Sequence, residues 1–167
     1  MVVSKHLSYV QGVKYLGYSF YVMKGKCLLT VHAKAKAKMK AKLKELTSRS
    51  NGWGYAKRKQ KLEEYIKGWV GYYHLANMKR FLIEMDEWLR RRLRMCIWKS
   101  WKRVKTRVAN LVKCGIDKYQ AYMWGNSRLG YWRIAGSYIL SRAITNEKLN
   151  MAGYATLMGS YIEWHPK

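Results

Sequence analysis

Residues 86–103 read DEWLRRRLRMCIWKSWKR, and this stretch decides the fold class that we expect for the chain. Its apolar residues, like those just upstream, recur at spacings of three and four, which is the period of one helix face. We therefore predict one long α-helix over residues 78–108. Basic residues and tryptophans are interleaved along it. Cations beside planar aromatic rings suit a polyanion with exposed bases, so the stretch favours RNA or DNA binding.

The composition of the whole chain also favours a polyanionic partner. Its 167 residues include 34 Lys and Arg against 9 Asp and Glu, which gives a formal net charge of +25. Such a charge repels itself in the folded state, and a bound polyanion relieves that repulsion. The hydrophobic fraction of 49% is sufficient for a buried core and excludes a disordered basic tail. The length fits one domain or two small ones.

Membrane and secreted proteins form the competing class. The sequence has no run of about 18 apolar residues, the length that a transmembrane helix requires. We also recognise no secretory leader and expect no membrane partner. The cysteines Cys27, Cys96 and Cys114 are odd in number and far apart, without metal-ligand spacing. We therefore expect reduced thiols and a location in a bacterial cytoplasm.

Strand signals are confined to the N-terminal segment, residues 1–31. Aromatic and apolar residues fill 15–22, Lys24-Gly25-Lys26 supplies a turn, and 27–31 returns. This pattern predicts a β-hairpin. Because an isolated hairpin is only marginally stable, we expect it to pack on the following helices or on a partner.

A lysine-rich segment over residues 32–48 is predicted to be helical, because Ala, Lys, Met, Leu and Glu are good helix formers. An apolar seam of Ala35, Met39, Leu43 and Leu46 then occupies one face. Two lysine rows flank it: the first is Lys34, Lys38 and Lys42, and the second is Lys36, Lys40 and Lys44. These rows fit a phosphate backbone, although lysine runs are more often simply solvated.

The remaining pattern completes a mainly α fold. A glycine-rich loop is expected over 49–58 and a second helix over 59–75. Shorter helices are expected over 117–124, 132–144 and 156–162. We therefore divide the chain into a hairpin (1–31), a three-helix, thumb-like bundle (32–108) and a C-terminal helical region (109–167) that is a candidate for DNA binding.

Catalytic chemistry is not evident in the sequence. A polymerase or nuclease that uses two metal ions needs several converging carboxylates, and the only aspartates, Asp86 and Asp117, stand alone. No nucleophile motif, phosphate-cradling loop or Cys/His set is present. We therefore expect no metal, no cofactor and no enzymatic activity of the chain on its own.

Several blocks, in order, resemble group II intron reverse transcriptases. Residues 12–20 resemble the junction of palm and thumb, and residues 46–49 the end of the first thumb helix. Residues 66–73 (IKGWVGYY) and the opening stretch are similar to the maturase-specific domain, called domain X. The combination in this order is specific, whereas any one block is weak.

The resemblance implies a role in which such proteins grip their intron RNA and help it reach a splicing-competent form. It also implies that the region holds template and primer during reverse transcription, and that a following region contacts target DNA. The Tyr-x-Asp-Asp block of the polymerase core is not found in this sequence, so DNA synthesis would need a separate fingers and palm polypeptide. The alternatives are the thumb subunit of a split RNA-directed DNA polymerase and a structural, basic ribonucleoprotein component.

Candidate RNA contacts follow from charge and helix faces. Arg90, Arg91 and Arg94 are expected to face the RNA, because Arg92 lies closer to the apolar seam. Trp98 and Trp101 either stack on bases or pack in the protein. The full predicted set is Lys34, Lys36, Lys38, Lys40, Lys42, Arg49, Lys57, Arg58, Lys59, Arg90, Arg91, Arg94, Trp98, Lys99, Trp101, Lys102 and Arg103.

Overall fold

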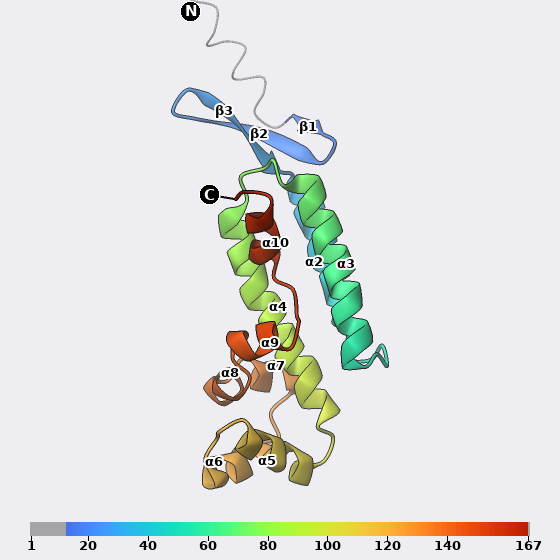
Figure 1. Cartoon of the computed structure of the whole chain (residues 1–167), viewed down its shortest axis with the longest axis vertical. Coiled ribbons are helices and arrows are strands. Elements are labelled where there is room, and N and C mark those ends of the chain that lie inside the picture. The colour runs from blue at the N-terminus through green and yellow to red at the C-terminus, as the bar shows by residue number, and fades with distance from the viewer. Residues whose placement is uncertain (1–12, 167) are drawn as a thin grey trace, which may run out of the picture.

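The computed structural model describes residues 13–166, and the fold is mainly α, as predicted (Figure 1). A small antiparallel sheet lies at one end, three long helices run away from it, and short helices gather at the other end and along one side. The helices are α2 (Ala33–Leu46), α3 (Tyr55–Tyr73), α4 (Lys79–Ser100), α5 (Val104–Lys113), α6 (Lys118–Gly125), α7 (Tyr131–Ala135), α8 (Tyr138–Ala143), α9 (Asn146–Met151) and α10 (Leu157–Glu163).

The sheet has the order β1-β2-β3, with strands β1 (Lys14–Tyr15), β2 (Tyr18–Met23) and β3 (Lys26–Val31). The predicted turn between β2 and β3 is confirmed, with positive φ at Lys24 (51°) and Gly25 (73°). A single strand over 15–22 was wrong, because Leu16 (φ 49°) and Gly17 (φ 85°) form a second two-residue turn. Two positive φ values in succession match the right-handed twist of the flanking strands.

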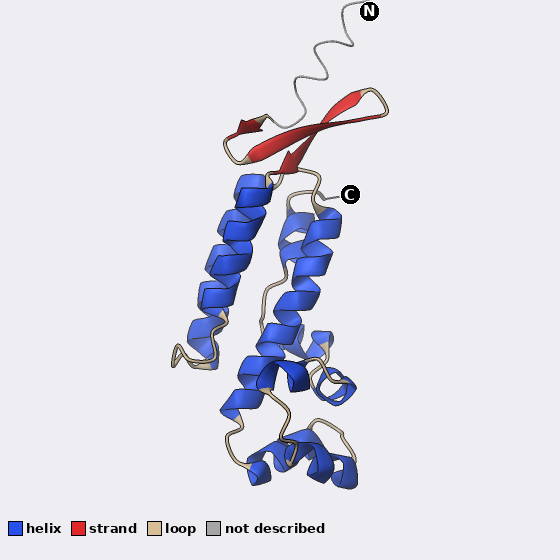
Figure 2. Ribbon diagram, turned by 180° about the vertical axis from the view of Figure 1, so that it is seen from behind, coloured by secondary structure: helices blue, strands red, loops and turns tan. Residues whose placement is uncertain are grey.

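The sheet packs on the ends of the long helices (Figure 2), which is the first of the two alternatives expected for the hairpin. The Tyr72 hydroxyl donates to the Leu16 carbonyl at 3.0 Å, and the Asn77 N–H donates to the Leu29 carbonyl at 2.9 Å. The first 12 residues of the predicted segment 1–31 lie outside the described residues.

Helix α2 confirms the predicted seam, because its buried residues are Ala35, Met39, Leu43 and Leu46. His32 caps its N-terminus, where the ring Nδ1 accepts from the Lys34 N–H at 3.1 Å. Burying this one narrow face fixes α2 against α3 and α4 and leaves both lysine rows on the outside of the bundle.

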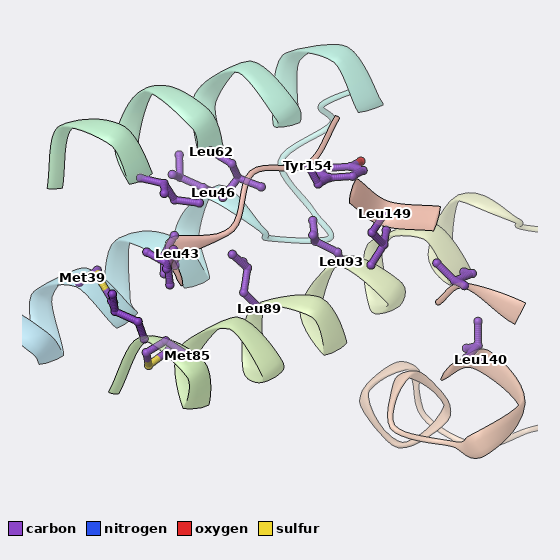
Figure 3. Packing of buried hydrophobic residues seen from close by; sticks show 14 of the residues in the cluster. Met39, Leu43, Leu46, Leu62, Met85, Leu89, Leu93, Leu140, Leu149 and Tyr154 are labelled. Atoms are coloured by element: carbon purple, nitrogen blue, oxygen red, sulfur yellow. The ribbon is translucent and has the colours of Figure 1, made fainter. Parts of the chain in front are cut away.

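The core joins the three long helices to the C-terminal segment (Figure 3). Met39 and Leu43 of α2 meet Leu62 of α3 and Leu89 of α4 in this cluster. The C-terminal segment adds Leu140, Leu149 and Tyr154 to the same cluster. The helix α10 packs against both α3 and α4, so the three-helix bundle is closed by residues distant in sequence.

The helix predicted over 78–108 is interrupted, since α4 ends at Ser100 and α5 begins at Val104. At the break Trp101 leaves helical geometry with ψ 64°. The Arg107 Nε donates to the Trp101 carbonyl at 3.0 Å, and its guanidinium lies 4.9 Å from the Trp98 ring centroid. These contacts secure the bend and swing α5 toward α6, against which it packs.

Other boundaries moved by several residues. Helix α3 starts four residues before the expected 59, because Gly54 already caps it. The helix expected over 132–144 is two helices, since the Ser137 hydroxyl donates to the Ile134 carbonyl at 2.7 Å and caps α8. The helices expected over 117–124 and 156–162 are confirmed by α6 and α10, whereas α9 was not foreseen. The boundary expected at residue 108 falls inside α5.

Candidate nucleic-acid interface

The first lysine row borders a cavity of about 460 Å³ on the α3 side of α2. Lys34 and Lys38 line it together with Lys14 of β1 and the aromatic rings of Tyr65 and Trp69. Cations from two elements therefore stand around an aromatic surface, which is the combination that favours a nucleic-acid strand.

The second lysine row faces α4 on the other side of the seam. The Lys36 Nζ lies 5.0 Å from the Phe81 ring centroid, and the Lys40 Nζ lies 5.6 Å from that of Trp88. Lys40, Lys44 and Trp88 line a cavity of about 420 Å³ there, to which Arg92 and Trp132 also contribute. Cation–π contacts at exposed sites are worth about 0.5–1 kcal/mol, so these lysines are oriented without losing their charge.

Carboxylates neutralise little of this surface. Within residues 13–166 the ion pairs are Lys42–Glu45, Lys61–Glu64, Lys67–Glu63 and Arg80–Glu84. Each joins exposed neighbours on one helix, and such pairs contribute little to stability. Apart from Lys42, the two lysine rows have no carboxylate partner among the described residues. Their charge is therefore available to an external anion.

Arg90 and Arg94 do not lie where the helix-face prediction placed them. Arg90 is 3% exposed and donates to the Asn150 side chain and the Tyr154 carbonyl. Arg94 is 9% exposed and donates at 2.8 Å to the Ile144 carbonyl and to the Asn146 side chain. Burial lowers the pKa of both guanidinium groups.

The exposure expected for these two arginines was therefore wrong. The face of α4 that the sequence suggested would be open is covered by the C-terminal segment, and nothing in the local periodicity reports that cover. Both guanidinium groups are buried and donate to the C-terminal segment, so we leave both out of the interface proposed below.

Arg91 and Arg92 are half-buried, and each donates hydrogen bonds to a backbone carbonyl of another segment. Arg91 donates to the Trp132 carbonyl through Nε at 3.3 Å and Nη2 at 2.9 Å, with its guanidinium 4.0 Å from the indole centroid. Arg92 donates to the Thr47 hydroxyl at 2.6 Å and to the Lys44 and Thr47 carbonyls at 3.0 Å. Arg92 thus ties α4 to the end of α2, but it is less buried than Arg90 and Arg94, so the expectation that it lies closer to the core than they do was wrong.

Of the two tryptophans predicted as RNA contacts, Trp98 is buried and Trp101 is half-buried. Trp98 is 1% exposed, which favours its packing alternative over base stacking. Trp101 is half-buried with its ring centroid 5.8 Å from that of Trp98. The cations that follow, Lys102 and Arg103, are exposed.

A second basic cluster forms where the α2–α3 loop meets the end of α4. It borders a cavity of about 390 Å³, named here the α3 pocket, whose lining includes Arg49, Arg58, Lys99 and Lys102. All four residues were in the predicted set, but they come from three separate stretches of the sequence. The sequence alone did not predict that they line one pocket. The Lys99 Nζ also donates to the Arg49 carbonyl at 2.7 Å, which holds the loop against α4.

Lys57 and Lys59, which flank Arg58 in the predicted set, do not line the α3 pocket. The Lys57 Nζ lies 5.4 Å from the Trp53 ring centroid. The Lys59 Nζ donates to the Ala152 carbonyl at 2.9 Å and so joins α3 to the C-terminal segment. Trp88 and Trp132 complete the cavity beside the second lysine row, but they were not in the predicted set. The three-four spacing signalled only an apolar face for Trp88, and no local signal marked Trp132.

Within residues 13–166, no helix is both long and apolar enough to span a membrane. No group of three or more His, Cys, Asp or Glu side chains gathers there in a way that could hold a metal ion.

Comparison with known families finds a match in the central part of the chain. Residues 36–115 match the family model described as group II intron, maturase-specific domain. The match begins in the first turn of α2 and ends just past α5, so it contains most of the lysine rows and all of α4. No curated protein matches the sequence. Residues 36–115 are therefore similar to the maturase-specific domain of group II introns, a domain that is not itself catalytic.

Proposed function

We propose that this chain binds group II intron RNA through the two lysine rows of α2 and assists the folding of that RNA into its splicing-competent form. The observation that carries the proposal is a helix with cations along both sides of its buried seam, within a maturase-specific domain. Lysines four residues apart in one row stand about 6 Å apart along the axis, which suits successive phosphates of one strand.

The surroundings of α2 support single-stranded or irregular RNA as the ligand. Aromatic side chains lie at the cavity on each side of the helix, with Trp69 on the α3 side and Trp88 on the α4 side. Unpaired bases stack on such rings, whereas a regular duplex presents only its backbone and groove edges.

The test replaces the second lysine row, Lys36→Gln, Lys40→Gln and Lys44→Gln together, because glutamine removes the charge and preserves helix propensity. The matched control replaces Lys105, Lys113 and Lys118 by glutamine, exposed residues on α5 and α6 with the same summed charge. We expect intron RNA affinity and splicing at low magnesium to fall far more in the first variant. Equal losses in both variants would show only non-specific attraction and would remove α2 from the interface.

A second candidate function, the thumb of a split RNA-directed DNA polymerase, is favoured by the outer surface of the sheet. Tyr15 and Leu16 at the β1–β2 turn are 64% and 63% exposed. A fingers and palm polypeptide would cover such apolar side chains. Co-purification of a neighbouring polymerase core, lost on Tyr15→Ser and Leu16→Ser, tests this function. Target DNA is a further proposed partner of the C-terminal region, for which the exposed arginines Arg128, Arg133 and Arg142 are the candidate contacts.

A further inference from the structure

The α3 pocket has a charge that its own side chains do not balance. Its lining contributes four cations, Arg49, Arg58, Lys99 and Lys102, and no carboxylate. The walls also include Trp53 and Tyr55, which offer aromatic surface beside the cations. The pocket thus combines positive charge with planar apolar groups.

The N-terminus of α3 lies at this pocket, because Gly54 and Tyr55 both line it. Gly54 is the capping residue and supplies no side-chain acceptor to the first N–H groups of the helix. The first turn has no acidic residue and instead contains Lys57 and Arg58. Cations at this end oppose the helix dipole, which favours negative charge there.

Arg58 gives a second, independent indication that the pocket suits an anion. It lines the pocket, is only 6% exposed, and its Nε has no hydrogen-bond partner among the described residues. Its Nη2 donates to the Asn51 side chain at 3.1 Å, so the guanidinium is held in place. A buried donor without an acceptor is costly, and a bound anion would relieve that cost.

We propose that the α3 pocket binds one phosphate group of an RNA strand, between the N-terminus of α3 and the side chains of Arg58 and Lys102. The inference rests on the proposed function and deepens it, by assigning an anchoring point for the strand at the far end of α2 from the sheet. Trp53 and Tyr55 give the base next to that phosphate a surface on which to stack.

The decisive variant is Gly54→Asp, with Gly54→Asn as its matched control. Gly54 has φ −70°, which any residue adopts, and an added Cβ meets no atom within 4 Å. Both side chains cap a helix well, but only aspartate brings a negative charge that competes with phosphate. Both variants should therefore fold at least as stably as the natural chain, so a loss of binding cannot be attributed to unfolding.

The first measurement is the thermal midpoint in inorganic phosphate against chloride at constant ionic strength. We expect phosphate to raise the midpoint of the natural chain and of Gly54→Asn, and to leave that of Gly54→Asp unchanged. An equal phosphate effect in Gly54→Asp, or none in the natural chain, would overturn the inference.

The second measurement is intron RNA affinity, which separates a strand phosphate from free phosphate. Gly54→Asp should bind about tenfold more weakly, the effect of losing one charge-assisted contact, while Gly54→Asn stays within about threefold. Unchanged affinity in Gly54→Asp would limit the pocket to free phosphate and overturn its role in RNA binding. The variant that lacks the second lysine row tests the proposed function separately. Phosphate should still raise its thermal midpoint, whether or not its affinity for intron RNA falls.

Discussion

Asp86 of α4 fixes the start of α10 by accepting a hydrogen bond from the backbone N–H of Leu157 at 2.8 Å. Its other carboxylate oxygen accepts from the N–H of Met158 at 2.9 Å. Asp86 thus acts as a helix cap supplied from another element, 71 residues earlier in the chain. The negative charge is also well placed at the positive end of the α10 dipole, although the helix is short.

Replacing this cap should weaken the whole bundle. We expect Asp86→Ala to lower the free energy of unfolding by about 1–2 kcal/mol, since two backbone donors lose their acceptor. Asp117→Ala is the comparison, because Asp117 caps only its own helix, α6, on the surface. Urea unfolding of both variants measures the difference. An Asp86→Ala cost no larger than that of Asp117→Ala would mean that α10 is not held through this contact.

Asp86 also gives stability a specific dependence on pH. Burial raises the pKa of its carboxyl group, and the opposing effects of the two N–H donors and of Arg90 are smaller. The folded protein therefore binds this proton more tightly than the unfolded chain does. The contribution to stability is complete below the unfolded pKa of about 4 and is lost as the pH rises through the folded pKa.

Asp86→Asn isolates this effect, because asparagine has no such proton. The stability of the natural chain minus that of Asp86→Asn should decrease as the pH rises from about 3.5 to 7. Urea unfolding at a series of pH values checks the sign. A difference that increases with pH would show that the hydrogen bonds outweigh burial at this carboxylate.

The arginines of α4 should behave as structural residues. Arg94→Met leaves the Ile144 carbonyl and the Asn146 side chain without their donor, and we expect a cost of about 2–3 kcal/mol. Arg80→Met removes the same charge from an exposed site and should cost less than about 0.5 kcal/mol. The measurement is chemical unfolding, followed by RNA binding under conditions where both variants are folded. An RNA-affinity loss confined to Arg94→Met under those conditions would return Arg94 to the interface.

The salt dependence of RNA affinity should report how many phosphates the protein contacts. Each lysine–phosphate contact contributes about −0.7 to −0.9 to the slope of log affinity against log salt. Losing the second lysine row should therefore make the slope shallower by about 2 to 3. Titrations of intron RNA at several salt concentrations give both slopes. A slope that the triple glutamine variant leaves unchanged would place those lysines in solvent.

The sequence predicts whatever depends on local periodicity. The seam of α2 could be assigned fully, since Ala35 to Leu46 bury one face whatever packs against it. The faces of α4 could not, because the cover over Arg90 and Arg94 comes from residues about 50 to 60 positions later. The bend at Trp101 depends on Arg107, which is part of the next helix. The α3 pocket is formed by tertiary contacts among three stretches of the sequence. Its basic residues could therefore be predicted from the sequence, but their arrangement around one pocket could not.

The closure of the bundle by α10 has a consequence for synthesis on the ribosome. The lysine rows of α2 are synthesised before α10, the helix that packs against α3 and α4. A nascent chain would present these lysines to RNA before the hydrogen bond between Asp86 and Leu157 has formed and before the core is complete. RNA bound to α2 at that stage would contact a bundle that α10 has not yet closed. The bundle is complete only after translation has passed residue 163.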